Sequence, residues 1–164
     1  SVVTFGYGAS LMVMYIAAVD VSISMILTFY LYSLLLAAIF LAISMLIGLI
    51  SKTRFQALGS SLIIWAFLVL FYEFLIMGAS LFVKEQFVLN VLSASIFLNP
   101  VELIRVWSIL SLDGASIFGP SLYELTIWAE GWQGTLLFVV SSLLWLLVPL
   151  LLSSFLLKGR IGNE

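Results

Sequence analysis

Residues 98–105 read Leu-Asn-Pro-Val-Glu-Leu-Ile-Arg, and they decide the fold because they start a helix in the middle of a very apolar sequence. Asn99 is a favoured N-cap residue, and Pro100 suits the first helical position, where its missing N–H leaves no hydrogen bond unmade. Glu102 falls at the third helical position, from which a carboxylate can reach back to the N–H of the cap. The pattern predicts a helix that begins at Pro100.

The composition around this stretch is that of a membrane protein. Of the 164 residues, 64% are hydrophobic and 9% are charged, whereas a soluble domain is nearer to half apolar and a quarter charged. The chain has no Cys and no His, which excludes disulfides, Cys-His and Ser-His-Asp nucleophile systems, and thiolate or imidazole metal sites. The net charge of −2 argues against nucleic acid as a partner.

Four apolar runs are long enough to cross a membrane core of about 30 Å, namely Ser1 to Val19, Val21 to Ile50, Phe55 to Val83 and Gly134 to Leu157. Residues Phe87 to Leu98 form a shorter run that would rise only about 18 Å as a helix, so we interpret it as re-entrant or interfacial. The sequence predicts an all-α integral membrane protein with a single membrane domain, residues 1–164. Its fold is a helical bundle of about four transmembrane spans plus a short re-entrant or interfacial helix on the extracytoplasmic side.

The basic residues predict the orientation. Lys52 and Arg54 lie in one short loop, and Lys158 and Arg160 lie in the tail. Because cytoplasmic loops are enriched in Lys and Arg, we expect both groups, and the C-terminus, in the cytoplasm. The acidic region 84–133 is then outside. It contains three tryptophans that fit an interfacial belt: Trp107, Trp128 and Trp132.

Glu73 lies inside the third apolar run and has two interpretations. A carboxylate near the centre of a membrane costs roughly 2.5 to 3.5 kcal/mol on insertion scales, so such residues usually face protein or a wet cavity. Glu73 recurs with Gly59, Ala66 and Ser80 at steps of seven residues, so these residues share one helix face. The functional interpretation places Glu73, Ala66 and Ser80 on a transport path. The alternative is a carboxylate near the outer interface, satisfied by a Tyr, a Ser or Arg105.

Three further patterns each leave two interpretations open. Glu102 and Arg105 form a favourable i, i+3 pair on a helix that lies at the outer interface or simply caps the spans. Ser44-x-x-x-Gly48 allows close helix packing, either within the subunit or in a dimer. Pro149 favours a kink in the last span, which serves a moving part or merely shapes the packing.

The chain resembles a known family. Four features carry the resemblance: the pattern Leu98-Asn99-Pro100-x-Glu102-x-x-Arg105, the Gly- and Ser-containing outer loop, the stretch from Leu46 to Phe74 and a final span with a basic tail. Together they are similar to the permease of the nitrous-oxide-reductase maturation system (NosY-like), a type-2 ABC exporter permease. Such permeases have six spans, with an amphipathic N-terminal helix and a coupling helix between the second and third spans. The resemblance implies that this sequence is the C-terminal portion of such a permease and begins partway through the third span.

The resemblance also implies partners and roles. The permease dimerises, binds two cytoplasmic ATPase subunits, contacts a periplasmic maturation protein and sits in the cell inner membrane. Its implied cargo is a sulfur species for the copper–sulfide centre of nitrous oxide reductase. Asn99, Pro100, Glu102 and Arg105 would shape a periplasmic gate or docking edge. The loop carrying Lys52 and Arg54 would be a minor cytoplasmic contact.

The sequence leaves other functions open. It has no GxxxxGK[ST] phosphate-binding motif, so we expect no cofactor in this chain, with ATP and Mg bound by the partner ATPase. It also lacks the acid, base and nucleophile set of an enzyme. A type-2 exporter for a drug, lipid, polysaccharide or ion remains possible on these residues. So does a non-transporting membrane assembly subunit, which would have no ATPase partner and would tolerate Glu73→Gln.

Overall fold

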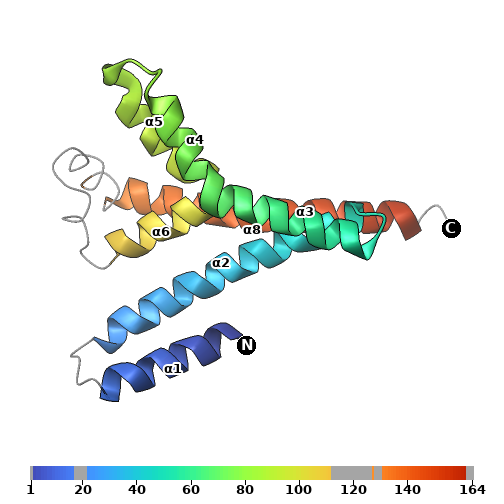
Figure 1. Ribbon diagram of the computed structural model, residues 1–164, viewed down its shortest axis with the longest axis horizontal. Helices are drawn as coiled ribbons and strands as arrows, with labels where there is room; N and C mark the ends of the chain where they lie inside the picture. The colour runs from blue at the N-terminus through green and yellow to red at the C-terminus, as the bar shows by residue number, and fades with distance from the viewer. Residues whose placement is uncertain (1, 17–21, 112–126, 128–130, 162–164) are drawn as a thin grey trace.

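The computed structural model describes residues 2–16, 22–111, 127 and 131–161, and within these ranges the chain is helical with no strand (Figure 1). The all-α prediction is therefore confirmed for the described residues. The helices are α1 (Val2–Ile16), α2 (Ile23–Ile50), α3 (Arg54–Ala66), the π-helical turn η1 (Phe67–Phe71), α4 (Tyr72–Ser80), α5 (Glu85–Leu98), α6 (Pro100–Leu110) and α8 (Trp132–Ile161).

Three helices are long and apolar enough to cross a membrane: Ile23–Ile50, Arg54–Ser80 and Trp132–Lys158. They coincide with three of the four predicted apolar runs, and the second of them continues from α3 through η1 into α4. The remaining run appears as α1, with 15 helical residues. Ser1 and residues 17–19 of that run lie outside the described residues. The chain is thus an integral membrane protein by the length and composition of its helices.

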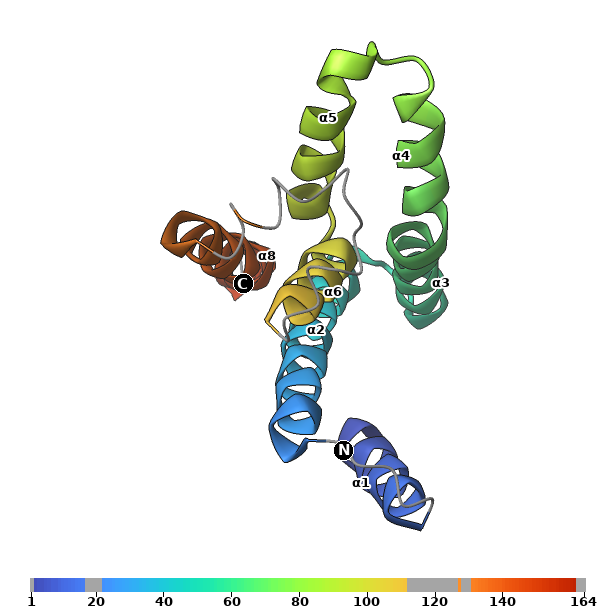
Figure 2. The same ribbon diagram turned by 90° about the vertical axis from the view of Figure 1, so that its left-hand side faces the viewer.

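The long helices run roughly side by side, and one hairpin diverges from them (Figures 1 and 2). The turn between α2 and α3 lies at the same end of the molecule as the last residues of α8. Lys52, Arg54 and Lys158 are therefore at one end. At η1 the path of the third span bends, and α4 leads away from the bundle with α5 returning beside it. Helix α6 then lies centrally, in contact with α2, α5, α8 and η1.

Helix α6 carries much of the core. Its residues Leu103, Val106 and Leu110 pack with Phe138 of α8 in one buried cluster. Trp107 stacks on Phe138 at 5.7 Å between ring centroids and meets a tyrosine of α2 edge-on. Trp107 is therefore partly buried and packed against the core, whereas its predicted place in an interfacial belt stays a prediction. Trp132 is exposed, and Trp128 lies outside the described residues.

The turn between α2 and α3 is held by capping bonds. The Thr53 hydroxyl accepts a hydrogen bond from the Gln56 N–H at 3.2 Å, and the Gln56 side chain accepts one from the Lys52 N–H at 3.1 Å. The first bond satisfies a donor that a helix start otherwise leaves unpaired, and the second pairs the N–H of the residue just before the cap. The loop that carries Lys52 and Arg54 is therefore a compact, defined turn.

We expect Thr53→Ala to destabilise the protein by about 1 kcal/mol, the usual value of an N-cap side chain. The matched control is Ser22→Ala, because Ser22 caps α2 without a side-chain hydrogen bond. The measurement is the thermal unfolding midpoint of the purified protein in detergent. Thr53→Ser should retain most of the stability, and equal losses for Thr53→Ala and Ser22→Ala would contradict the capping role.

The sequence predicts two packing features, one around Ser44 and Gly48 and one around Pro149, and only Pro149 is buried. Ser44 and Gly48 are exposed, and a Cβ at Gly48 would meet no described atom within 4 Å. The described part of the subunit thus does not use this pattern for close packing. Helix α8 continues through Pro149, and the buried Ser153 hydroxyl donates to the Pro149 carbonyl at 2.7 Å. Pro149 is buried too, so it faces the interior of the bundle.

Candidate functional site

The break between α5 and α6 is built around Asn99, whose side chain is fully buried. Its Oδ1 accepts a hydrogen bond from the Val101 N–H at 2.9 Å, and Pro100 occupies the first turn of α6. The predicted N-cap and helix start are confirmed. The predicted reciprocal bond, in which the Glu102 carboxylate would accept from the Asn99 N–H, is replaced by another contact. The Glu102 carboxylate accepts from Arg105 instead.

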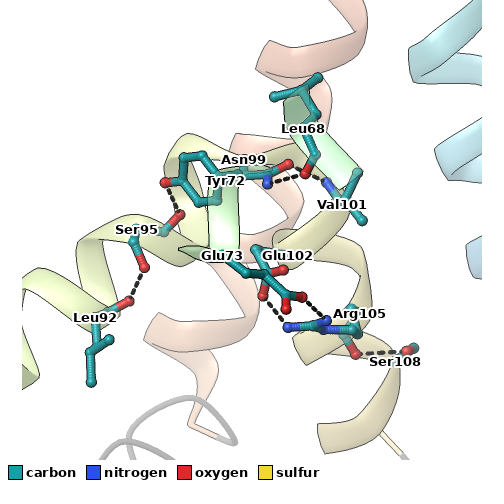
Figure 3. A network of polar contacts seen from close by, with 10 residues as sticks. All are labelled: Leu68, Tyr72, Glu73, Leu92, Ser95, Asn99, Val101, Glu102, Arg105 and Ser108. Carbon is teal, nitrogen blue, oxygen red and sulfur yellow. Dashed lines mark hydrogen bonds and ion pairs between the residues drawn. The ribbon is translucent and has the colours of Figure 1, made fainter. Parts of the chain in front are cut away.

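The other half of the Asn99 amide reaches the third span. In η1 the Tyr72 N–H donates to the Phe67 carbonyl, five residues back. In an α-helix the same N–H would donate to the Leu68 carbonyl, so the π-turn releases that oxygen from its usual donor. Asn99 Nδ2 donates to the Leu68 carbonyl at 2.8 Å (Figure 3). One buried side chain therefore caps α6 and satisfies the carbonyl that η1 releases.

The C-terminal end of α5 is held in a related way. Its last carbonyls have no partner within the helix. The Tyr72 hydroxyl donates to the Ser95 carbonyl at 2.8 Å, and Trp145 Nε1 of α8 donates to the Phe97 carbonyl at 3.1 Å. Side chains from two other helices thus supply donors where α5 stops. Irregular backbone is tolerated at membrane depth only where such partners exist.

We expect Tyr72→Phe to cost about 1 kcal/mol, because it removes the hydroxyl that donates to the Ser95 carbonyl and leaves the ring in place. The control is Tyr30→Phe, which removes a hydroxyl whose hydrogen bond to Thr4 is exposed. Thermal unfolding in detergent compares the two. If Tyr72→Phe unfolds no earlier than Tyr30→Phe, the bond to α5 does not stabilise the hairpin.

Three charged side chains meet beside the break (Figure 3). Arg105 Nη1 pairs with Glu73 Oε1, and Arg105 Nη2 donates to Glu102 Oε2 at 2.6 Å. Glu73 and Arg105 remain about half exposed, at 50% and 51%, whereas the Glu102 side chain is 12% exposed. Burial raises the pKa of the Glu102 carboxyl, Arg105 opposes that rise, and the Glu73 carboxylate adds to it. We call Glu73, Glu102 and Arg105 the ion cluster.

The ion cluster lines a cavity of about 330 Å³ between α4, α5 and α6. Tyr72 and Ser80 line it from α4, and Ser95 lines it from α5. The rest of the wall is apolar, formed by Ile76, Met77, Leu92, Ile96 and Val106. The arrangement offers a partly open pocket that is charged in one place and apolar around it.

The structure brings only some of the predicted site residues together. Glu73, Ser80, Glu102 and Arg105 line the cavity, and Glu73 makes the contact to Arg105 that the alternative interpretation names. Ala66 is not among the lining residues. The predicted helix face that joins Ala66 to Glu73 requires a continuous α-helix, but η1 lies between these two residues. A π-turn accommodates one extra residue, which shifts the helical register by about 100° per residue.

The sequence does not predict several residues of the site. Tyr72, Ser95 and Trp145 make the bonds at the end of α5, yet they look like ordinary span residues. The one available signal was that a helix starting at Pro100 requires the preceding helix to stop within an apolar segment, where its carbonyls need donors. Among the described residues, no group of three or more His, Cys, Asp or Glu could hold a metal ion.

No protein-family model, curated protein or solved structure matches this chain.

Proposed function

We propose that this chain is the transmembrane permease subunit of an ABC exporter. The observation that carries the proposal is the α5–α6 break, whose backbone is tied to two spans through Asn99, Tyr72 and Trp145. Transporters place discontinuous helices inside the bundle, where the interrupted backbone lines a cavity. Here the break borders the cavity that holds the ion cluster. A passive membrane anchor has no need of such an arrangement.

The proposed topology has four spans, with α1 as the first and both ends in the cytoplasm. Its support is that the α2–α3 turn, which carries Lys52 and Arg54, lies at the same end of the molecule as the last residues of α8, which include Lys158, together with the preference of basic residues for the cytoplasmic side. Helices α5 and α6 then form a re-entrant pair that enters from the periplasmic side. The membrane in question is the cell inner membrane, and the C-terminus is cytoplasmic.

The proposed partners follow from the resemblance to nitrous-oxide-reductase maturation permeases. They are a second copy of the permease, two cytoplasmic ATPase subunits that bind ATP and Mg, and a periplasmic maturation protein. In this arrangement the chain is a transport subunit and not an enzyme, and ATP hydrolysis resides in the ATPase chain. Asn99, Pro100, Glu102 and Arg105 belong to the periplasmic gate, and the turn with Lys52 and Arg54 is a minor cytoplasmic contact.

The proposed cargo is a sulfur species for the copper–sulfide centre of nitrous oxide reductase. One observation favours a different cargo, because a cavity of about 330 Å³ with mainly apolar walls is larger and less polar than a small sulfur species needs. The second candidate is therefore a type-2 exporter of an amphipathic cargo. Both candidates share the ATPase partner and differ in what crosses.

The test begins with affinity purification of the protein from its native cells and identification of any ATPase subunit that accompanies it, followed by expression of the two together. We expect co-purification, ATPase activity in lipid nanodiscs, and loss of that activity when the ATPase is inactivated. Deletion of the permease gene should abolish the optical signature of the copper–sulfide centre in nitrous oxide reductase purified from the cells. A normal copper–sulfide centre with an active permease–ATPase complex would favour the second candidate. Absence of any ATPase partner would overturn both.

A further inference from the structure

We infer that the cavity between α4, α5 and α6 binds a small amphipathic cation, an ammonium group that carries one apolar chain or ring. The charge of the ion cluster is the first argument. Two carboxylates share one guanidinium, and each uses a different Arg105 nitrogen. Burial and the Glu73 carboxylate raise the pKa of the Glu102 carboxyl, so the cluster is either neutral, with one proton shared by the carboxyl groups, or carries one excess negative charge when both are ionised. An entering cation would balance it, whereas an anion would meet Glu73 and Glu102 and find Arg105 already paired.

Exposure is the second argument. The Glu73 side chain is half exposed, so a ligand in the cavity can reach its carboxylate. Glu73 accepts from Arg105 through its Oε1, and Glu102 accepts from Arg105 through its own Oε2. The two carboxyl groups also lie within hydrogen-bonding reach of each other, so an ammonium between them would meet acceptor oxygens from both. An ammonium donates up to three hydrogen bonds, which suits two neighbouring carboxylates.

The apolar walls and the volume of the cavity limit the chemistry and the size of the part of the ligand that follows its charged group. Outside the ion cluster the lining is dominated by apolar side chains of three helices, among them Ile76, Leu92 and Val106. A volume of about 330 Å³ lies at the low end of the range of roughly 300 to 1,000 Å³ for small-molecule pockets. This space accepts a single short chain or one ring system and not a two-chain lipid. A bare metal ion would leave the apolar walls without a partner.

The test uses three probes with the same tail and different head groups: octylammonium, octanol and octanoate. Radiolabelled octylammonium is equilibrated by dialysis with the protein in phosphatidylcholine nanodiscs, and binding to empty nanodiscs is subtracted. We expect one saturable site, with competition by octanol and octanoate at least about tenfold weaker, as a charge-assisted hydrogen bond implies. Equal competition by all three probes would reduce the cavity to a plain apolar groove and overturn the inference.

The matched variants are Glu73→Gln and Glu73→Asp. Glu73→Gln should weaken octylammonium binding by about tenfold to a hundredfold, and Glu73→Asp should retain most of it because the charge stays. Met77→Trp, which adds bulk to the cavity wall, should weaken all binding. Unchanged affinity in both Glu73→Gln and Met77→Trp, with the proteins folded, would overturn the inference.

The inference rests on the proposed function only in calling this ligand a cargo. Binding is measured without the ATPase, so a failed ATPase experiment leaves this result intact, and the converse also holds.

Discussion

Replacing Asn99 with Asp is expected to lower the free energy of unfolding by about 2 to 3 kcal/mol. Asp is as good an N-cap as Asn, so its carboxylate keeps the bond to the Val101 N–H. It cannot donate to the Leu68 carbonyl, however, and a buried acceptor then faces a buried carboxylate oxygen. Leaving such a group unpaired costs about 1 to 3 kcal/mol, and more where a charge is involved. The variant therefore separates the link to η1 from the capping of α6.

Reversible unfolding in mixed micelles, followed by tryptophan fluorescence at pH 8, measures this loss. Asn90→Asp makes the same chemical change at an exposed position of α5 and should have a smaller effect. Asn99→Ala removes the cap as well as the link, so we expect it to be destabilising too. If Asn99→Asp is as stable as the unmodified chain, the bond to Leu68 contributes nothing.

The second large effect is expected from Arg105→Gln, which removes the cation shared by two carboxylates. Breaking a buried pair by removing one partner costs about 3 to 5 kcal/mol, because the remaining charge is uncompensated. Glu102 is the carboxylate concerned, since it is 12% exposed and Glu73 is 50% exposed. Because Arg105 itself is 51% exposed, we expect a loss below that range, about 1 to 2 kcal/mol. Glu73→Gln should cost at most about 1 kcal/mol, as exposed ion pairs do.

A double variant tests the cause of this loss. Arg105→Gln combined with Glu102→Gln removes the uncompensated charge, so it should be more stable than Arg105→Gln alone. The unfolding midpoints of the two proteins, measured under identical conditions, give the comparison. A double variant no more stable than the single one would mean that Arg105 acts through packing of its side chain and not through its charge.

The helical character and the major helix boundaries could be predicted from the sequence, because hydropathy and capping are local properties. The start of α6 at Pro100 followed from Asn99 and Pro100 alone. The apolar runs fixed α2 and α8 for the same reason. The capping bonds around Thr53 also have a local signature, Thr-x-x-Gln, which is a variant of the capping box.

The site was less predictable because its key contacts join residues far apart in the chain. The bond between Asn99 and Leu68 depends on a π-turn, and the sequence Phe-Leu-Val-Leu-Phe gives no local reason for one. The π-turn also breaks the helix face from Ala66 to Glu73, because that face requires α-helical spacing throughout. The sequence predicts the pairing of Glu73 with Arg105 only as one of two alternatives. The sequence predicts where a residue lies along its own helix, but it does not predict which residue of another helix that side chain contacts.

The π-turn limits which single-residue deletions the sequence can accept during evolution while it keeps the pairing of Glu73 with Arg105. It behaves as a single-residue insertion accommodated inside a helix. Deleting one residue from 67–71 would restore α-helical hydrogen bonding and give the Leu68 carbonyl, or its replacement, a donor within its own helix. Glu73 would then point about 100° away from Arg105. An alignment gap of one residue in this segment therefore marks a chain in which a residue other than Glu73 must pair with the arginine.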